Sequence, residues 1–206
     1  MDNTIFAFPS NTETNQLITE IEAKFDIEYQ GTLDDFIDVN IDSLPNGNIK
    51  LLQPHSIEQI VQDLNIAQRA PPCSTPEKFI GIILLDLSVT SFDYRLQYRS
   101  VVENIYFLEK CTREDISYAT HQFSWFFKHP HHTHDSAIKC FAAYLCGTRI
   151  NRLILDPNQS NSFELYADAD LCGNWYITTT NYDPSATKSQ SWYILLYTGC
   201  PYFMGL

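Results

Sequence analysis

The residue types best suited to chemistry in this chain are its histidines, four of which fall within the segment His129-Pro130-His131-His132-Thr133-His134. Neutral imidazole is a good ligand for zinc, copper and nickel, so the segment suggests a metal site, with His121 upstream as a further ligand. Pro130 interrupts the segment, however, and no cysteine or carboxylate stands at a familiar zinc spacing from it. Because proline-bounded polar clusters are commonly loops, we interpret the segment as the solvated start of a helix.

Cysteine chemistry is the second candidate. The six cysteines are scattered, without a CxxC pair, which argues against a zinc ribbon and against a small disulfide scaffold. A Cys-His nucleophile could use Cys111 or Cys140, but no glycine-flanked signature surrounds either thiol. Buried structural cysteine is the commoner state, so we predict reduced, structural thiols.

The composition is that of a folded protein with a strongly acidic balance. The 206 residues are 44% hydrophobic and carry a formal net charge of -12, and Lys24 and Lys50 are the only cations before Asn65. The negative charge of the chain as a whole opposes binding to the phosphate backbone of a nucleic acid. No apolar run is long enough for a membrane span, and the N-terminus lacks a secretory pattern. We therefore expect an intracellular protein, cytoplasmic or nuclear, without membrane contact.

The hydrophobic pattern predicts an α+β fold in two parts. Asn46-Gly47, between two strand-like runs, is a hairpin signal, and Pro54 suits the first turn of a helix. Prolines interrupt residues 69–93, which we expect to separate a strand-and-helix half from a mainly helical half. The elements expected before this connection are a strand at 4–8, a helix at 12–25, hairpin strands at 36–41 and 49–52, and a helix from Pro54 to Leu64.

After residue 93, apolar residues recur first at helical spacing and then at every second position. Gly147 is a suitable C-terminal stop for the last helix. The strands that follow are expected to pair with one another as one sheet. The elements expected here are helices at 94–110, 113–128 and 132–146, and strands at 152–155, 163–168 and 192–197.

Six short motifs occur in one fixed order along nearly the whole chain. They are Lys24-Phe25-Asp26-Ile27 with Gly31, Leu33 and Phe36; Leu52-Gln53-Pro54-His55; Tyr98-Arg99-Ser100-Val101-Val102; Thr112-Arg113-Glu114-Asp115; Tyr144-Leu145-Cys146-Gly147-Thr148; and Tyr166-Ala167-Asp168-Ala169-Asp170. Together they resemble the copia-type reverse transcriptase family. Their order is more specific than any single motif, because unrelated proteins would not present all six at these intervals.

The resemblance implies a section of a retrotransposon Pol polyprotein. The family carries out RNA-directed DNA synthesis in transposition, with Mg²⁺ as cofactor and an RNA/DNA hybrid as nucleic-acid partner. The implied organisation is the C-terminal part of the palm and a thumb-like region at 1–68, a linker at 69–93, a helical connection segment at 94–149 and a truncated RNase H-like domain, an incomplete sheet, at 150–206.

For the polymerase, the resemblance aligns the family's paired aspartates with the start of this chain. Asp2 then takes the place of the first aspartate, and Asn3 replaces the second. An amide lacks the charge that a hard dication prefers, and the family's third carboxylate belongs to a palm strand upstream of this stretch. We therefore expect no polymerisation by this chain and interpret Asp2 as a frayed terminal residue.

For the RNase H-like domain, the resemblance makes Asp168 the first of several carboxylates that hold two metal ions. Asp168 is thus the candidate catalytic and metal-binding residue, and Asp170 could flank it. We interpret the two as solvated turn residues, because exposed aspartates before glycine are ordinary in turns. The family's next acidic ligand would follow Leu206, so cleavage of a hybrid is also expected to be absent.

The chain departs from the family's pattern at several positions. Asp38 and Glu103 stand where the family has glycine, and Glu114 stands where it has proline. A charged side chain in place of glycine costs packing or a backbone angle. Together with an incomplete terminal sheet, these exchanges predict marginal stability and relaxed constraint.

Two alternatives stay open beside an inactive polyprotein fragment, so the sequence leaves open whether the chain is an enzyme. The chain could be a non-enzymatic binding module that a host has retained, using the helical segment and its acidic face. It could also be a split exon of an intact polyprotein, in which case the flanking DNA would encode the palm and the remaining RNase H carboxylates.

Overall fold

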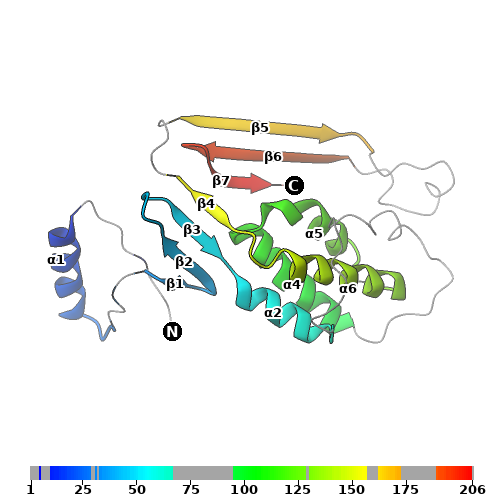
Figure 1. Ribbon diagram of the computed structural model, residues 1–206, viewed down its shortest axis with the longest axis horizontal. Coiled ribbons are helices and arrows are strands. Elements are labelled where there is room, and N and C mark those ends of the chain that lie inside the picture. Colours follow the sequence, from blue (N-terminus) through cyan, green and yellow to red (C-terminus); the bar gives the residue numbers. More distant parts are fainter. Residues whose placement is uncertain are drawn as a thin grey trace.

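The computed structural model describes residues 5, 10–28, 31, 33–66, 95–128, 130–156, 162–172 and 189–205, which form helices and two antiparallel sheets (Figure 1). The mixed α and β composition predicted from the hydrophobic pattern is therefore confirmed. The strand expected at 4–8, apart from Ile5, and the whole of the connection expected at 69–93 lie outside the described residues.

The first helix, α1 (Asn11–Glu22), lies close to where the sequence predicts it. Ser10 caps it, because the Ser10 hydroxyl accepts a hydrogen bond from the backbone N–H of Glu13 at 3.4 Å. No residue of α1 is buried, and Phe25, at the end of the predicted helix, is 65% exposed. The helix stands to one side of the other elements (Figure 1), and none of its residues is packed into the core formed by the described residues.

Four short strands form the first sheet, in the order β1 (Asp35–Phe36), β2 (Val39–Ser43), β3 (Ile49–Leu52) and β4 (Leu153–Leu155). The predicted β2–β3 hairpin is confirmed, and it turns through Gly47 with φ of +85°. Strand β4 pairs with β3, although the sequence pattern predicts that it pairs with the later strands. That prediction is wrong because α2, which follows β3, packs against α6, which precedes β4, and so brings the two strands together.

The strand predicted at 36–41 is broken by a two-residue turn. Ile37 and Asp38 both have positive φ, 48° and 60°, between the paired residues Phe36 and Val39. Such a turn matches the twist of a hairpin but needs two residues in the left-handed region. Asp38 stands where the resembled family has glycine, and the positive φ explains why glycine suits that position. Ile37 is the more strained of the two, since β-branched residues rarely adopt this conformation.

The substitution Ile37→Gly is expected to raise the free energy of unfolding by about 1 kcal/mol, because glycine removes the left-handed strain. Little burial is lost, as Ile37 is 53% exposed. Urea unfolding followed by circular dichroism would measure the change. Ile150→Gly is the matched control: Ile150 is 75% exposed and is not among the residues with positive φ, so it should give no gain. Equal effects of the two substitutions would contradict the strain at Ile37.

The helices form the core of the protein. They are α2 (Pro54–Asp63), α4 (Arg95–Cys111), the 3₁₀ turn η1 (Glu114–Ile116), α5 (Ser117–Ser124) and α6 (His132–Gly147). The helices predicted at 54–64, 94–110 and 132–146 are confirmed, whereas the one predicted at 113–128 is divided into η1 and α5 and ends at Ser124. Their inward faces supply the largest fully buried apolar side chains, which are Ile60, Val101, Val102, Ile105, Leu108, Ile116, Phe123, Ile138 and Leu145. Burial of each such side chain contributes roughly 1.5–3 kcal/mol. None of the described helices is both long and apolar enough to cross a membrane.

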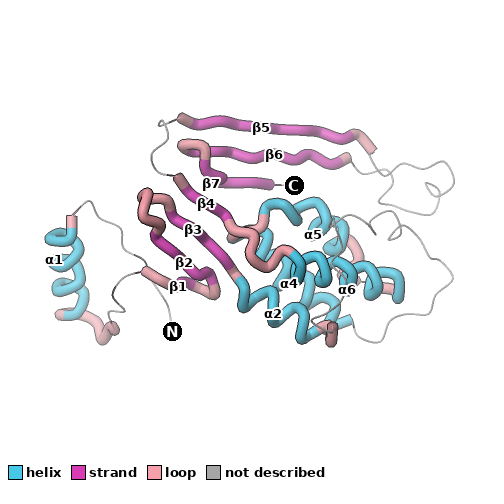
Figure 2. Tube along the Cα trace, viewed as in Figure 1, coloured by secondary structure: helices cyan, strands magenta, loops and turns pink. Residues whose placement is uncertain are grey.

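The second sheet consists of β5 (Phe163–Asp170), β6 (Gln190–Tyr197) and β7 (Cys200–Gly205), in that order. The predicted pairing of the strands at 163–168 and 192–197 is confirmed. Strand β7 is not predicted from the sequence; it follows a turn at Thr198-Gly199, whose φ values are +53° and +74°. Figure 2 shows the four-stranded sheet leading into the helical core through α2, with the three-stranded sheet above α5.

Candidate functional site: an acidic hollow beside a buried polar network

A network of polar side chains around the buried Arg113 joins η1 to the end of α6. Arg113 is 2% exposed, and its Nε and Nη2 donate to the two carboxylate oxygens of Asp115 at 2.8 and 2.9 Å. The guanidinium also donates to the backbone carbonyl and the hydroxyl of Thr148, at 3.2 and 2.8 Å. The Tyr144 hydroxyl donates to Asp115 at 2.9 Å. Because a buried guanidinium needs all of these acceptors, the network fixes the end of α6 against η1.

Three further polar contacts within the helical core are buried in the same way. Each joins residues that are distant in sequence or that lie on different elements, so each fixes how two segments pack. The contacts are Thr112 Oγ1 to Gln53 Oε1 at 2.9 Å, Ser117 Oγ to Glu109 Oε1 at 2.8 Å, and the Tyr98 hydroxyl to the Phe123 carbonyl at 3.1 Å. Gln53, Tyr98 and Thr112 all belong to the short motifs found in the sequence, which therefore have structural roles here.

The two acidic residues of η1 have different electrostatic environments. Burial raises the pKa of the Asp115 carboxyl, but hydrogen bonds and charge from Arg113, with a hydrogen bond from Tyr144, outweigh burial and hold that pKa below its usual value. Burial raises the pKa of Glu114 above its usual value. Asp115 is thus held as an anion by its partners, whereas the environment of Glu114 disfavours the charged form.

An acidic hollow with a volume of about 370 Å³ lies between the three-stranded sheet and η1. Asp168 and Asp170 of β5 line one side, and Glu114 and Asp115 line the other. Trp192, which is opposite Asp168 in the β5–β6 register, also lines the hollow. The structure therefore brings the predicted Asp168 close to residues of the buried network, which the sequence alone did not indicate.

The carboxylates of the acidic hollow do not fit a pair of metal ions. Both oxygens of Asp115 already accept hydrogen bonds from Arg113 and Tyr144, which leaves them poorly available to a cation. Among the described residues, no group of three or more histidine, cysteine or acidic side chains could hold a metal. Asp168 and Asp170 are exposed, as interpreted from the sequence, but they lie within a strand and not in a turn. Asp2 and Asn3 lie outside the described residues.

The histidine segment begins helix α6, as predicted from Pro130. The expectation that it is solvated is wrong for His134, which is 2% exposed. The His134 ring stacks on Phe126 with centroids 4.0 Å apart, and its Nδ1 accepts a hydrogen bond from the backbone N–H of His131 at 2.7 Å. His134 is therefore part of the packed helix start, and His129 lies outside the described residues.

The cysteines follow the prediction only in part. Cys111, Cys146 and Cys200 are free thiols, and burial raises the pKa of Cys111 and Cys146. Raised values disfavour the thiolate, so neither residue is activated as a nucleophile. Cys140 is disulfide-bonded, so the prediction of reduced thiols is wrong for this residue.

A larger cavity, of about 600 Å³, lies where the two sheets meet the helices. Leu51 and Leu153 line it from the four-stranded sheet, and Tyr193 and Tyr202 line it from the three-stranded sheet. Cys111 contributes from the end of α4. The end of α4 and the start of α5 thus line the same cavity as residues of both sheets.

Sequence reasoning did not assign a role to Arg113. The signal that could have found it is the pair of motifs Thr112-Arg113-Glu114-Asp115 and Tyr144-Leu145-Cys146-Gly147-Thr148, which the structure joins through the Arg113 network. A charged residue inside a mainly apolar helical region needs a partner, and the second motif supplies it.

Comparison with known proteins gives three similar proteins from Arabidopsis thaliana. The chain is 27% identical to the retrovirus-related Pol polyprotein from transposon RE1 over 184 residues, which are 88% of this chain and 12% of that protein. It is 27% identical to the Pol polyprotein from transposon RE2 over 164 residues, 79% of this chain and 11% of that protein. An uncharacterized mitochondrial protein is 27% identical over 175 residues, 84% of this chain and 70% of that protein.

No protein-family model matches the chain, and no solved structure matches it. The resemblance to a transposon Pol polyprotein is nevertheless confirmed, because the similarity to two such polyproteins extends over most of this chain. The chain spans only about an eighth of the length of those two relatives.

Proposed function

We propose that this relative of the transposon Pol polyproteins is a copia-type section that joins the reverse-transcriptase palm to an RNase H-like domain. Its role is structural: the helices α2, α4, α5 and α6 form a packed core, and α2 and α6 bring strands β3 and β4 of the first sheet together. It has no catalytic activity by itself. In an intact polyprotein the RNA/DNA hybrid and Mg²⁺ would be held largely by other parts of the protein, and the setting would be intracellular.

The observation that carries this proposal is that Arg113 is buried and that its donors are paired within the chain. The network links two of the resembling motifs, and it does so with hydrogen bonds between the chain's own residues. A motif that serves catalysis usually presents polar atoms to a cleft, whereas Arg113 is 2% exposed and its donors are directed to Asp115 and Thr148. These motifs are therefore best explained as parts of a scaffold.

The structure also suggests a revision of the proposed domain boundary at residue 150. Strand β4 pairs with β3 and completes the first sheet, so we assign Leu153–Leu155 to the palm-end unit. The RNase H-like unit then starts near Phe163, at β5. Either unit expressed alone would therefore need the boundary to fall between β4 and β5.

Purified protein is expected to show neither primer extension nor cleavage of an RNA/DNA hybrid, with Mg²⁺ or with Mn²⁺. The physical reason is that Asp115 is already engaged, so that Asp168, Asp170 and Glu114 remain around the acidic hollow without a fourth available carboxylate. Gel-based extension and cleavage assays would measure this, with a complete reverse transcriptase as positive control. Cleavage above the buffer level that disappears in Asp168→Asn would contradict the proposal.

A second candidate function is a retained, non-enzymatic binding module. It is favoured by the mitochondrial relative, because the matched stretch makes up 70% of that protein and is thus not confined to long polyproteins. Detection of this chain as a stable protein of 23.8 kDa in its source cells would favour the module. Detection of the same peptides only in a much larger product would favour the polyprotein section.

A further inference from the structure

Two histidines beside the connection between α5 and α6 accept hydrogen bonds through a ring nitrogen. The Nε2 of His121 accepts from the indole Nε1–H of Trp125 at 3.1 Å, and the Nδ1 of His134 accepts from the backbone N–H of His131 at 2.7 Å. An indole N–H and a backbone N–H can only donate. Each accepting nitrogen is therefore without a proton, and both bonds exist only while the two imidazole rings are neutral.

The two bonds stand at the two ends of this connection. Trp125 is the C-cap of α5, and His131 is the N-cap of α6. The residues from 125 to 131, of which 129 lies outside the described residues, form neither helix nor strand, and Lys128 among them is exposed. We call this segment the α5–α6 connection. It is held to α5 through His121 and to α6 through His134.

Protonation of His134 would place a charge inside the helical core. The side chain is 2% exposed, and its ring stacks on Phe126 of the α5–α6 connection with centroids 4.0 Å apart. His134 is the third residue of α6, where the positive end of the helix dipole opposes a cation. Protonation would also direct an Nδ1–H toward the backbone N–H of His131, so that two donors would face one another without an acceptor.

Charged and titratable groups of α6 itself lie around His134. Asp135 favours a positive ring, but its carboxylate is paired with Lys139 at 2.7 Å. His132 lines a hollow of about 410 Å³ together with these two residues. The ring of His131 has its centroid 5.5 Å from that of His134. Because like charges repel, a positive ring at either of these two positions opposes protonation of the other.

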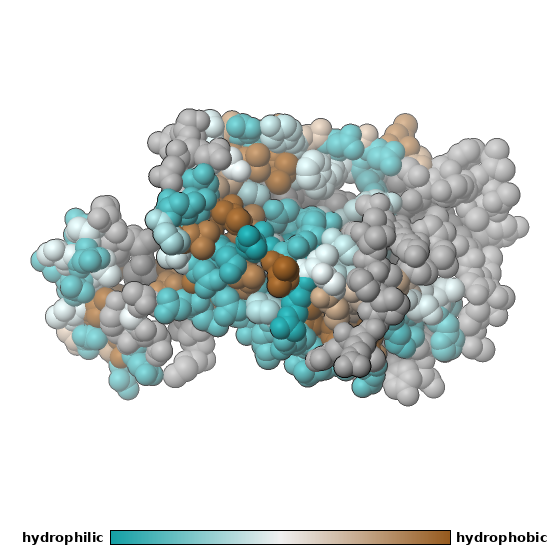
Figure 3. Space-filling model, viewed as in Figure 1, coloured by the Kyte–Doolittle hydropathy of each residue, from teal (hydrophilic) through white to brown (hydrophobic). Residues whose placement is uncertain are grey.

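Charged groups on the neighbouring helices already have partners. Asp63 belongs to α2, whose surface carries hydrophilic residues in Figure 3, and it lines the same hollow. Its carboxylate accepts a hydrogen bond from Gln59 at 2.8 Å. On α4, Arg99 is paired with Glu103 at 2.8 Å. Burial raises the pKa of the Tyr98 hydroxyl on α4, so this ring, 6.4 Å from the imidazole of the third residue of α6, stays neutral.

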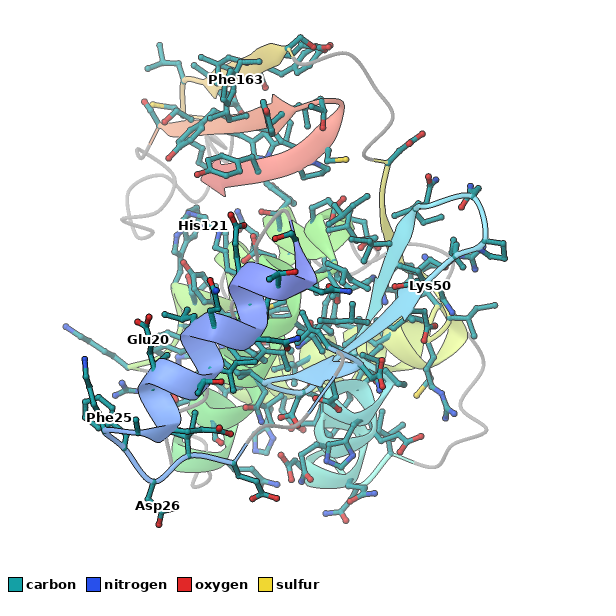
Figure 4. All side chains as sticks on the ribbon, turned by 90° about the vertical axis from the view of Figure 1, so that its left-hand side faces the viewer. Glu20, Phe25, Asp26, Lys50, His121 and Phe163 are labelled. Atoms are coloured by element: carbon teal, nitrogen blue, oxygen red, sulfur yellow. The ribbon has the colours of Figure 1, made fainter. Side chains whose placement is uncertain are left out.

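His121 lies on the side of the helices that faces the three-stranded sheet (Figure 4). Its ring packs edge-on against that of Trp125, with centroids 5.3 Å apart. The cavity of about 600 Å³ that it lines also contains Glu109 and Lys110 of α4 and Glu114 of η1. The two carboxylates favour a positive ring and the lysine opposes it. A proton on Nε2 would remove the acceptor for Trp125.

We propose that the α5–α6 connection is an acid-sensitive joint, closed while His121 and His134 are neutral and open when both are protonated. Imidazole changes its charge between about pH 8 and about pH 5, so acidification across this range opens the joint. Opening releases the first turn of α6 from Phe126 and leaves the apolar contacts among α2, α4 and α6 in place. This inference goes beyond the proposed scaffold role and does not rest on it. All the residues involved belong to the helices and their connection, far from both ends of the sequence.

Hydrogen exchange of the ¹⁵N-labelled full chain, followed by NMR, measures the two bonds directly. The probes are the backbone N–H of His131 and the indole Nε1–H of Trp125, each corrected for the pH dependence of exchange in an unstructured peptide. We expect their protection to fall by about tenfold or more between about pH 7.5 and about pH 5.5. Protection of the backbone N–H of Leu108, in the buried part of α4, should change by less than about threefold.

Glutamine at the two histidine positions separates loss of the acceptor from other effects of acid. His134→Gln keeps an acceptor at the third position of α6, where glutamine can complete a capping box, but it does not titrate. In this variant the protection of the His131 N–H should change by less than about twofold over the same pH range. His121→Gln should have the same effect on the Trp125 indole. His132→Gln is the matched control: His132 is exposed, so this variant should keep the response of the parent protein.

A direct measurement on the parent protein covers the case in which a glutamine variant does not fold. Long-range ¹⁵N–¹H spectra identify the ring nitrogen that carries the proton, and we expect an unprotonated Nδ1 on His134 and an unprotonated Nε2 on His121 at about pH 7.5. A proton on either nitrogen at that pH would overturn the proposal. Unchanged protection of His131 and Trp125 on acidification, or an equal pH response in His134→Gln and the parent, would do the same. Simultaneous loss of protection at Leu108 would also overturn it, because acid would then unfold the whole core.

Discussion

Arg113→Met is expected to lower the free energy of unfolding by about 3 kcal/mol, because it removes one partner of a buried, hydrogen-bonded ion pair. This loss is at the lower end of the range for removing one partner of a buried ion pair, because the Asp115 side chain is 41% exposed and can be hydrated. Thr148 also loses its two hydrogen bonds from the guanidinium. Urea unfolding, monitored by circular dichroism at neutral pH, would measure the change.

Arg99→Met is the matched control for this substitution. Arg99 forms an ion pair with Glu103 at 2.8 Å, but the two side chains are 63% and 55% exposed. Exposed pairs of this kind on a helix contribute about 0.3–0.5 kcal/mol, so the control should be nearly neutral. Similar losses for the two variants would mean that the Arg113 network does not hold the fold together.

The parent protein and Arg113→Met also allow a test of the ion pair by pH. Because the pKa of folded Asp115 is below its unfolded value of 3.8, the carboxylate contributes stability above that pH, and the contribution is lost as the pH falls through the folded value. Arg113→Met removes the main cause of the lowered pKa. The difference in unfolding free energy between the parent and Arg113→Met should therefore shrink on acidification from about pH 6 to about pH 2. A difference that does not change with pH would contradict this assignment.

Phe123→Ala is expected to lower the free energy of unfolding by about 4 kcal/mol, because it opens a cavity at the centre of the helical core. Phe123 is 1% exposed and contacts the ring of Phe141 edge-on, with centroids 5.4 Å apart. The milder substitution Phe123→Leu should cost about 1–2 kcal/mol and keeps the measurement possible if the alanine variant does not fold. Thermal and urea unfolding would both report the loss.

Phe163→Ala is the control for this prediction, since it makes the same chemical change on the open strand β5. Phe163 is 67% exposed, and its ring contacts that of Tyr197 with centroids 4.7 Å apart. We expect a loss of less than about 1 kcal/mol. Comparable losses at positions 123 and 163 would indicate that the helices are not the stable part of this protein.

Much of the secondary structure could be predicted from the sequence, because local patterns specify it. The helices from Pro54, around Leu108 and up to Gly147 follow the helical spacing of their apolar residues, and their bounds agree with the structure within a few residues. The hairpin at Gly47 is also a local signal, as glycine is favoured where φ is positive.

The pairing of β4 with β3 could not be predicted in the same way. The apolar pattern of Leu153–Leu155 predicts a strand, but it does not specify which sheet edge that strand joins. The choice depends on the packing of α2 against α6, which is a tertiary contact. Strand β7 was missed for a different reason: Pro201 argues against a strand, yet it is tolerated here because β7 is at the edge of its sheet.

The sequence names Asp168 as a candidate site residue but does not indicate what lies around it. Asp168 was singled out through resemblance, and the structure adds Glu114 and Asp115 across the acidic hollow. A single sequence cannot reveal that η1 and β5 approach one another. The sequence does not indicate the burial of His134, because a histidine among polar residues after Pro130 looks solvated, although its ring stacks on Phe126.

The pairing of β3 with β4 has a consequence for how the chain emerges from the ribosome. Strand β3 is synthesised about a hundred residues before its partner, which at 5–20 residues per second means a wait of roughly 5–20 s. Throughout that interval one side of β3 has no neighbour, and a nascent chain in this state can pair with the wrong segment or with another nascent chain. Slow translation of the stretch between α2 and α6 should therefore increase chaperone binding and aggregation.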